Sequence, residues 1–425
     1  MAVQIFPKET PQSSTAVAKG GILALLDETG QLPPVELLIR PVTAPPEAER
    51  PVVNLTTFLD YQFSSSILIP VDSFQFTFAI PDDQTPFFEQ VKEGDIVTLA
   101  ANNVPLAVGI IDQLDIQTDP ENGERITVVG RDLMGQLEDQ DSVSLDSQII
   151  YANKISLKDA VNKLIQNTRI QSVVERGSPV VSNALLATEP GESKLSALLR
   201  FLEPYNCLAW MDPFGNINIG KPNMAQTPKT TNIFCDRTGQ NSNVLSIKAV
   251  RNSTQIPNVF VPISAEQATI QNRIGKQQAQ YNNAAGPNRL YRAGHRLPKA
   301  LVVSLPNSAA PDDLSKLNLI NQILQVTTKN PANAFRSLLS YYANRERARQ
   351  NQRELIVQVI VPSHFNDLGE PFVVDTIYNV FYERGSVNEP MYLFQVDYTG
   401  GERGQQTSLF FCKLNTIVAD IPLQR

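Results

Sequence analysis

Residues 190–221 read PGESKLSALLRFLEPYNCLAWMDPFGNINIGK, and this stretch decides the fold that we expect. Four leucines recur at helical spacing and predict one apolar helix face: Leu195, Leu198, Leu199 and Leu202. Pro204 ends this helix, because proline has no N–H to donate and clashes with the preceding turn. Apolar residues then alternate with small or polar ones, which predicts two strands half buried on one face: Leu208, Trp210, Ile217 and Ile219. Residues 212–216 have turn chemistry, so the stretch predicts a helix followed by a hairpin.

The end of the same stretch satisfies a phosphate-binding pattern, GxxxxGK, at residues 215–221. The full motif needs Ser or Thr as the next residue, followed by a helix whose N-terminal amides face the phosphate. Here Pro222 comes next, and the residues between the two glycines alternate as a strand does. We therefore interpret this pattern as a hairpin that ends in a turn, with no nucleotide site.

Composition excludes several classes of protein. A chain of 425 residues with 42% hydrophobic residues is long enough for two to four domains. A net charge of −7 argues against a dedicated DNA-binding protein, which needs a basic surface. The three cysteines have no CxxC spacing, which argues against a disulfide scaffold or a zinc site. We expect no secretion signal, because the start of the chain lacks a basic segment followed by an apolar core. We expect no membrane span, because the longest apolar runs fall far short of the roughly 20 residues needed to cross a bilayer.

Catalytic chemistry is poorly supported. His295 and His364 are the two histidines, and neither lies near a nucleophile or in a metal-binding motif, so we interpret both as solvated loop residues. Acidic residues cluster at positions typical of turns: Asp112, Asp115, Asp119, Glu138, Asp139, Asp141, Asp312 and Asp313. The sequence therefore predicts no enzyme, with no catalytic residue, cofactor or metal.

The chain divides into four segments. Residues 1–50 are proline-rich and predict an extended arm with one strand at 35–40. Residues 51–140 contain short strands spaced by polar turns, which predicts a small β-barrel or sandwich. Residues 141–225 predict an α+β domain, in which Ser156 and Asp159 resemble a capping box and the helix they start ends near Arg169.

Residues 226–425 return to β patterns. A Gln- and Asn-rich stretch at 264–290 predicts a long loop, and residues 332–353 predict one long helix near the C-terminal strands. Arg345, Arg347 and Arg349 lie near the end of that helix. Positive charge there offsets the helix dipole in a solvated last turn, or forms a basic contact surface for an acidic partner.

Four passages occur in the order typical of one family: residues 126–139, 190–221, 243–261 and 336–361. They resemble, in turn, a segment that closes a first barrel, a helix–hairpin, a strand pair that opens a second barrel, and an arginine-studded helix before the last strands. The family is the baseplate hub of contractile phage tails, of the Mu-like and late control protein D group. The residues that carry the resemblance are Gly130, Arg131, Asp132, Glu192, Trp210, Asp212, Gly215 and Asn216.

This resemblance implies a mainly β fold in which an α+β domain joins two tail-tube-like β-barrels. It implies a homotrimer that forms a pseudo-sixfold ring in the virion tail baseplate, assembled in a bacterial host cytoplasm. The implied partners are the tail tube protein, a trimeric central spike, the C-terminus of the tape-measure protein and baseplate wedge proteins. Genomic DNA would pass through the ring only in transit, and the protein would not bind membrane itself.

The sequence leaves three other readings open. A receptor- or carbohydrate-binding tail protein with stacked β domains would favour exposed aromatic residues, whereas this chain has one tryptophan. A cell-wall hydrolase is the second reading. The third is the hub of a phage-like injection system that delivers no DNA.

Overall fold

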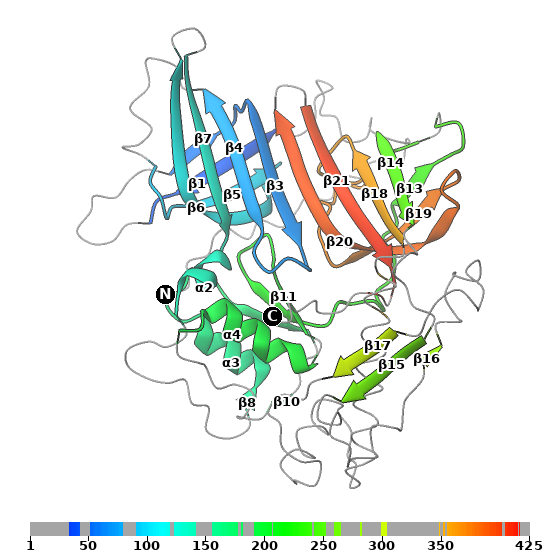
Figure 1. Ribbon diagram of the computed structural model, residues 1–425. Helices are drawn as coiled ribbons and strands as arrows, with labels where there is room; N and C mark the ends of the chain where they lie inside the picture. The colour runs from blue at the N-terminus through cyan, green and yellow to red at the C-terminus, as the bar shows by residue number, and fades with distance from the viewer. Residues whose placement is uncertain are drawn as a thin grey trace.

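The computed structural model places two groups of strands above a smaller module of helices and strands (Figure 1). It describes residues 34–42, 52–79, 91–119, 123–141, 155–176, 180–181, 191–205, 207–239, 242–251, 259–264, 281–282, 299–303, 348, 352, 355–401, 404–414 and 416. None of the helices in these ranges is both long enough and apolar enough to span a bilayer.

Thirteen strands form one large sheet. Its first half contains β1 (Val35–Arg40), β2 (Val53–Leu55), β3 (Asp60–Ser66), β4 (Ser73–Ala79), β5 (Ile96–Ala101), β6 (Val104–Asp119) and β7 (Gly123–Asp132). Its second half contains β13 (Asn232–Cys235), β14 (Ser246–Arg251), β18 (Leu355–Val361), β19 (Thr376–Tyr382), β20 (Val387–Gly401) and β21 (Gly404–Lys413). Strands β3 and β20 join the halves through seven antiparallel residue pairs, from Gln395↔Ser66 to Gly401↔Asp60.

The two halves repeat one topology. The pairing order β3-β4-β7-β6-β5-β1 in the first half corresponds to β14-β18-β21-β20-β19-β13 in the second. Each half also has a β-bulge at the equivalent place, between Ile111 and Gln113 in β6 and between Leu393 and Gln395 in β20. One pairing differs, because β1 and β5 are antiparallel whereas β13 and β19 are parallel. The pairings leave both halves open among the described residues, so two closed barrels stay a prediction.

The module below the sheet contains the predicted helix and hairpin (Figure 1). Its elements are α2 (Gly135–Asp139), β8 (Ile155–Ser156), α3 (Leu157–Leu164), β9 (Val173–Arg176), β10 (Val180–Val181), α4 (Lys194–Leu202), the 3₁₀ turn Glu203–Tyr205, β11 (Leu208–Met211) and β12 (Ile217–Gly220). A further sheet contains β15 (Val259–Ser264), β16 (Tyr281–Asn282) and β17 (Lys299–Val303).

The hairpin of β11 and β12 is the middle layer of the molecule, and not a strand pair half buried on one face as predicted. Its register places Trp210 opposite Asn218, so Trp210 and Ile219 point to opposite faces. Leu208 and Trp210 pack with large-sheet residues such as Tyr392. The other face packs against the helices, with Ala209, Met211, Ile217 and Ile219 in the same cluster as the core of α3 and α4. All eight strand residues are buried because both faces are covered.

Local sequence patterns predicted α4, the start of α3 and β1 correctly. The predicted helix over the leucines forms as α4, and Ser156 caps α3 by accepting a hydrogen bond from the Asp159 N–H at 3.0 Å. The helix α3 ends at Leu164, earlier than the predicted end near Arg169. Residues 35–40 form β1 as predicted, but β1 pairs with β5 along its whole length and is therefore integral to the first half of the sheet.

In the later part of the chain, the structure contradicts the predicted strand pair and describes only two residues of the predicted long helix. The passage at 243–261 was expected to form a strand pair, but β14 pairs with β18 whereas β15 pairs with β16 and β17 in a separate sheet. The prediction was wrong because the two strands do not pair with each other: each pairs with strands that come later in the chain. Within the helix predicted at 332–353, Ala348 and Gln352 are helical, and its other residues lie outside the described chain, as do most of 264–290.

His364 is fully buried and not solvated as predicted. Its Nδ1 lies 2.7 Å from the Thr407 hydroxyl, whose proton goes to the carbonyl oxygen of Ser363 at 2.8 Å. Nδ1 must therefore donate, and Nε2 accepts from the Tyr61 hydroxyl at 2.7 Å. Burial lowers the pKa of His364 to about 3. Because Tyr61 belongs to β3 and Thr407 to β21, the neutral imidazole connects both halves of the sheet.

Replacing His364 should change the pH dependence of stability. The unfolded chain takes up a proton at this side chain below its ordinary pKa of 6.5, whereas the folded chain stays neutral down to about pH 3. The contribution of His364 is therefore present above pH 6.5 and decreases as the pH falls from there. Urea unfolding of the wild type and His364→Gln should show a difference of about 1–3 kcal/mol at pH 7.5 that shrinks at pH 5. A difference independent of pH would contradict the assignment.

Candidate functional site

The first motif that carries the resemblance, Gly130-Arg131-Asp132, lies at the sheet corner formed by β6 and β7. Gly130 has no room for a side chain, because a Cβ there would lie 2.0 Å from the Ile110 carbonyl oxygen and 2.3 Å from the Phe74 ring. Gly109 on the neighbouring strand is crowded by the same ring. These close contacts allow β7 to pass tightly against β4 and β6 immediately before its chain enters the module.

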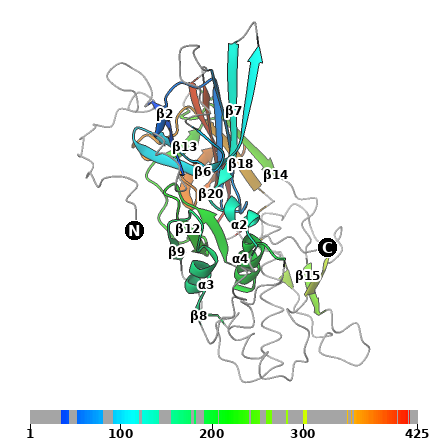
Figure 2. The same ribbon diagram turned by 90° about the vertical axis from the view of Figure 1, so that its left-hand side faces the viewer.

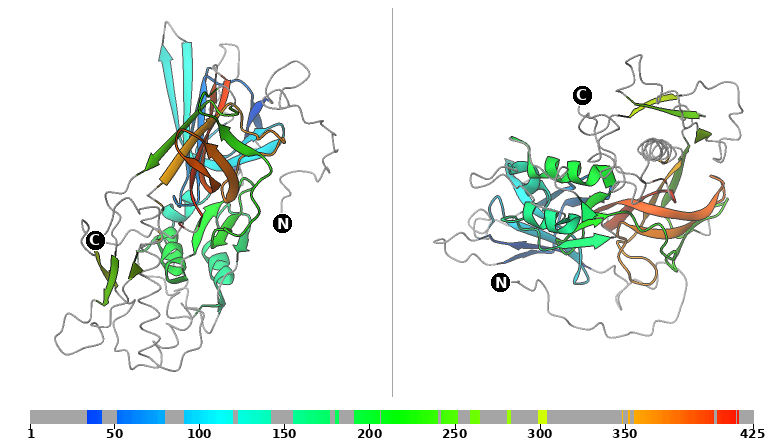
Figure 3. Two further views of the ribbon diagram at one scale, coloured as in Figure 1. Left: turned by 90° about the vertical axis from the view of Figure 1, so that its right-hand side faces the viewer. Right: turned by 90° about the horizontal axis from the view of Figure 1, so that it is seen from below.

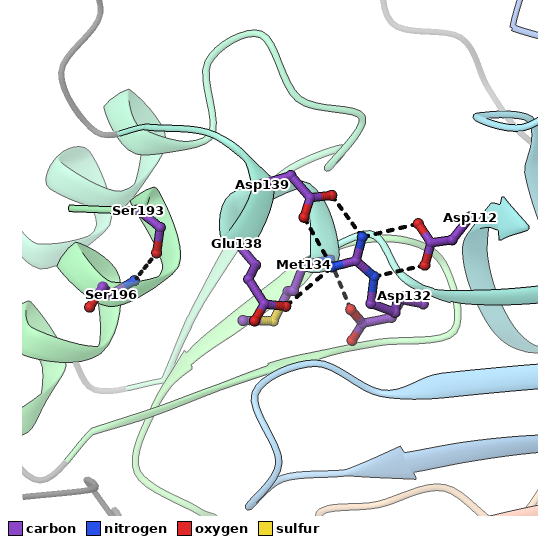
Figure 4. Close-up of polar contacts among 8 residues, drawn as sticks. Asp112, Asp132, Met134, Glu138, Asp139, Ser193 and Ser196 are labelled. Atoms are coloured by element: carbon purple, nitrogen blue, oxygen red, sulfur yellow. Dashed lines mark hydrogen bonds and ion pairs between the residues drawn. The ribbon is translucent and has the colours of Figure 1, made fainter. Parts of the chain in front are cut away.

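Arg131 is the centre of a cluster of ion pairs at this corner. Asp112 is the extra residue of the β6 bulge, and its carboxylate accepts from Arg131 Nε at 2.7 Å and Nη2 at 3.0 Å. Asp139, at the end of α2, accepts from Nη2 at 2.7 Å and Nη1 at 3.2 Å, and Glu138 accepts from Nη1 at 3.2 Å. Figure 4 shows these three carboxylates gathered around the guanidinium.

The cluster connects the sheet to the module and leaves two more negative charges than positive. The hydrogen bonds that Arg131 donates to Asp112 and Asp139 raise the pKa of its guanidinium above the ordinary value, so the charge is permanent. A β-bulge re-aims one side chain without ending the strand, and here it aims Asp112 at the arginine. Arginine suits this position because its planar fork bonds two carboxylates bidentately.

Asp132 and Asp72 form a buried carboxyl pair beside the cluster. Asp132 accepts from the Met134 N–H at 2.9 Å at the start of α2, and Asp72 accepts from the Ser66 N–H at 3.0 Å. The backbone N–H of Asp132 donates to the Asp72 carbonyl at 2.9 Å, so the two residues are neighbours. Burial raises the pKa of both carboxyls, and the charge of Asp132 raises that of Asp72 further. One oxygen of each has no hydrogen-bond partner among the described residues.

Glu192 fixes the start of α4. It accepts from Arg200 Nε at 2.9 Å and Nη2 at 2.7 Å, and its side chain is 11% exposed. The next residue, Ser193, caps the helix by accepting from the Ser196 N–H at 3.1 Å (Figure 4). Lys194 donates from its backbone N–H to the Gln140 carbonyl at 2.8 Å, which attaches α4 to the chain that leaves α2.

The second motif, Asp212 to Asn216, forms the tip of the hairpin. Asp212 accepts from the backbone N–H groups of Phe214 and Asn216, each at 2.9 Å, and Asn216 Nδ2 donates to its second oxygen at 2.9 Å. Gly215 adopts a φ of +84°, which favours glycine. A Cβ on Gly215 would lie 3.1 Å from Leu133, the residue directly after the first motif. The fold therefore brings the two sequence motifs into contact.

A second junction ties the module to the other half of the sheet, and sequence reasoning missed it. Arg176 on β9 lies 2.7 Å from Asp375, which is 3% exposed on its side chain, and 5.7 Å above the Trp210 ring. Asp375 also accepts from the Tyr392 hydroxyl at 2.6 Å. Asp375 has a φ of +61° in the bend before β19, and its neighbours in the sequence form no recognisable motif. Trp210, one of the residues that carry the family resemblance, lies directly beside this pair.

The arrangement joins the sheet to the helices through ion pairs and hydrogen bonds. The predicted residues from Gly130 to Asp132 and from Glu192 to Asn216 fall into one connected junction between sheet and helices. Within the described residues no three His, Cys, Asp or Glu side chains are placed to hold a metal ion. Cys207, Cys235 and Cys412 are free thiols. His295, Arg345, Arg347 and Arg349 lie outside the described chain.

Several solved structures share this fold, whereas no protein-family model and no curated protein matches the chain. The tail protein from Neisseria meningitidis MC58 is 16% identical with a TM-score of 0.64, over 90% of this chain and 98% of that one. The 43 kDa tail protein of prophage MuSo2 from Shewanella oneidensis is 16% identical with a TM-score of 0.64, over 90% and 99%.

A third solved structure comes from a secretion system. The Escherichia coli c3393 protein, a type VI secretion component described as structurally similar to the T4 tail proteins gp27 and gp5, is 11% identical with a TM-score of 0.51, over 92% and 80%. At these identities the likeness shows the fold, and the chain has the fold of phage tail proteins, as its sequence resemblance indicated.

Replacing Arg131 should weaken the junction. In Arg131→Met three carboxylates face one another without a counter-charge, and we expect a loss of about 1–2 kcal/mol in unfolding free energy because the cluster is partly exposed and screened. Urea unfolding in low and high salt measures this, and the loss should be smaller in high salt. Arg125→Met, an exposed arginine on the same strand, is the matched control. Equal effects of the two substitutions would contradict the role of Arg131.

Replacing Asp132 should reveal the buried carboxyl pair. Burial raises the pKa of Asp132 from 3.8 to about 7, so the folded chain holds a proton that the unfolded chain releases. This proton stabilises the fold at low pH, and its contribution is lost as the pH rises through about 7. The wild type should therefore gain stability relative to Asp132→Asn between pH 8 and pH 5. A stability difference between the wild type and Asp132→Asn that does not change with pH would contradict the pairing.

Proposed function

We propose that this protein is the structural hub of a contractile phage tail baseplate, and that it adapts a sixfold tail tube to a threefold central spike. The observation that carries the proposal is the repeated topology of the two sheet halves within one chain. A trimer of such chains presents six similar units around one axis, which suits a hexameric partner on one side. The module beneath the sheet occurs once per chain, which suits a threefold partner on the other.

The fold similarity supports this proposal. The two tail proteins, one of them from a prophage, align over nearly their whole length with 90% of this chain, so the full architecture is shared and not one domain. The sequence resemblance to baseplate hubs adds the order of its four passages, which run from residue 126 to residue 361. On this proposal the protein resides in the virion tail, contacts the tube, spike, tape-measure and wedge proteins, and has a structural and not an enzymatic role.

The charge of the chain fits a channel through which DNA passes without adhering. The net charge is −7, and like charge repels phosphate. The junction around Arg131 is itself acidic, because three carboxylates surround one guanidinium. Such a hub would guide DNA during ejection by exclusion, with no site for a specific sequence.

The hub of a DNA-free injection system is the second candidate. The likeness to a type VI secretion component, over 92% of this chain, favours it. Its physical role would be the same adaptor between tube and spike, and the two candidates differ in the cargo. A receptor- or carbohydrate-binding tail protein is less well supported, because Trp210 is buried between two layers and cannot stack on a sugar.

Solution mass tests the proposal. Light scattering on the full chain over a concentration series should give about 141 kDa, three times the 47.0 kDa of one chain. Negative-stain images of the same sample should show rings with a sixfold-like outline on one face. A stable mass of 47.0 kDa, both alone and with the cognate spike, would contradict the proposal.

A further inference from the structure

The topological repeat assigns each strand of the first half an equivalent in the second. The bulges align Ile111 with Leu393, since both precede the extra residue. The residues that follow are similar, Gln113-Leu-Asp115 in β6 and Gln395-Val-Asp397 in β20. Following the pairings outward through β7 and β21, and then through β4 and β18, aligns β3 with β14 and Phe63 with Ala249.

The segment of β20 after its bulge pairs with a further strand of the same chain, whereas the equivalent segment of β6 has no such partner among the described residues. In β20 the segment directly after the bulge pairs with β3, with Tyr398 opposite Phe63. The equivalent segment of β6, Gln113 to Asp119, pairs with β7 on one side and has no strand on the other among the described residues. Strand β14 pairs with β18 and likewise has no second strand in the described chain. Figures 2 and 3 show β6 and β7 extending beyond the neighbouring strands.

We propose that β14 of a second copy of this chain pairs antiparallel with the β6 segment, in the register that β3 uses on β20. This inference rests on the ring-forming hub proposed above and names the contact that closes the ring. The register places Ile116 opposite Ala249 of the neighbouring copy, as Tyr398 lies opposite Phe63. It then places Gln117 opposite Lys248 and Asp115 opposite Val250 of the neighbour.

The side chains on the two edges are complementary in this register. Ile116 is 42% exposed although the neighbouring Ile126 is fully buried, and the second copy would cover it on the core face of the sheet. On the outer face Lys248 would lie diagonally across from Asp115, within reach of an opposite-charge cross-strand pair. Val250, 44% exposed, would be covered beside Asp115. A free strand edge pairs readily with another chain, so these two edges suit such a partner.

This contact is heterologous, because it joins two different edges of the sheet. A heterologous contact closes into a ring when the rotation between copies permits it. The joint between copies would have the same geometry as the β3–β20 joint within a copy. The ring would therefore be continuous in hydrogen bonding, with the within-chain and between-chain joints alternating.

Disulfide trapping tests the register in the full-length protein. Gln117→Cys with Lys248→Cys places two cysteines directly opposite each other between copies, and mild oxidation should give covalent dimers and trimers on a non-reducing gel. The matched control is Asp115→Cys with Ser246→Cys, also exposed positions on the same face but four residues apart along the strand, about 13 Å. The single variants reveal any disulfide with the three native cysteines.

Charge reversal is a second test that does not depend on oxidation. Asp115→Lys or Lys248→Asp alone should weaken association several-fold in light scattering, and the double reversal should restore it. The expected result is efficient trapping of Gln117→Cys with Lys248→Cys and no trapping of the control cysteine pair, together with restored association in the double charge reversal. A mass of 141 kDa (three times 47.0 kDa) with equal or absent trapping in both cysteine pairs would overturn the register and leave the hub standing. A monomer of 47.0 kDa in every variant and in the wild type would overturn both.

Discussion

The antiparallel joint between β3 and β20 is the constraint on which the rest of the structure depends. Its seven residue pairs turn two β regions that are more than 300 residues apart in sequence into one sheet. Polar groups reinforce it, because the half-buried Ser64 donates to Asp397 at 2.7 Å across the joint and the buried His364 accepts from Tyr61 beside it. Buried hydrogen bonds of this kind fix register, since a slip by one residue would move every side chain to the wrong face.

In each half of the sheet, the extra residue of a β-bulge anchors the module. In β6 the bulged residue is Asp112, which accepts from Arg131 and so makes an ionic contact with α2. In β20 the equivalent bulged residue is Phe394, which packs in one apolar cluster with Trp210. The repeat therefore supplies two anchors at equivalent places, one polar and partly exposed, the other apolar and buried. A duplicated β unit can in this way hold a module that is not duplicated.

Short-range signals in the sequence predicted individual elements well. The leucine spacing of α4, the Ser156 cap and the Asp212 turn are each determined by neighbours within a few residues, so their patterns are visible without the fold. The resemblance to baseplate hubs predicted the phage tail fold. The faces of the hairpin could not be predicted, because a strand covered on both sides has no side that alternation can distinguish.

The features that the sequence could not show depend on contacts between residues that are far apart along the chain. His364 looked like a loop residue, yet Tyr61 and Thr407 bury it from positions 303 and 43 residues away. Asp112 and Asp139 looked like separate turn acids, and the bulge in β6 together with the short helix α2 brings both to Arg131. Arg176 and Asp375 gave no motif at all. Each case depends on pairing between distant segments, which one sequence does not reveal.

Hydrogen exchange of the full-length protein most directly tests the claim that the two β regions form one sheet. The amides of β3 and of Gln395–Gly401 in β20 are expected to exchange as slowly as those of the central strands β4 and β21, and to open with them in one cooperative step. Fast exchange at β3 and β20, with the central strands of both halves still protected, would show two independent domains and contradict the account.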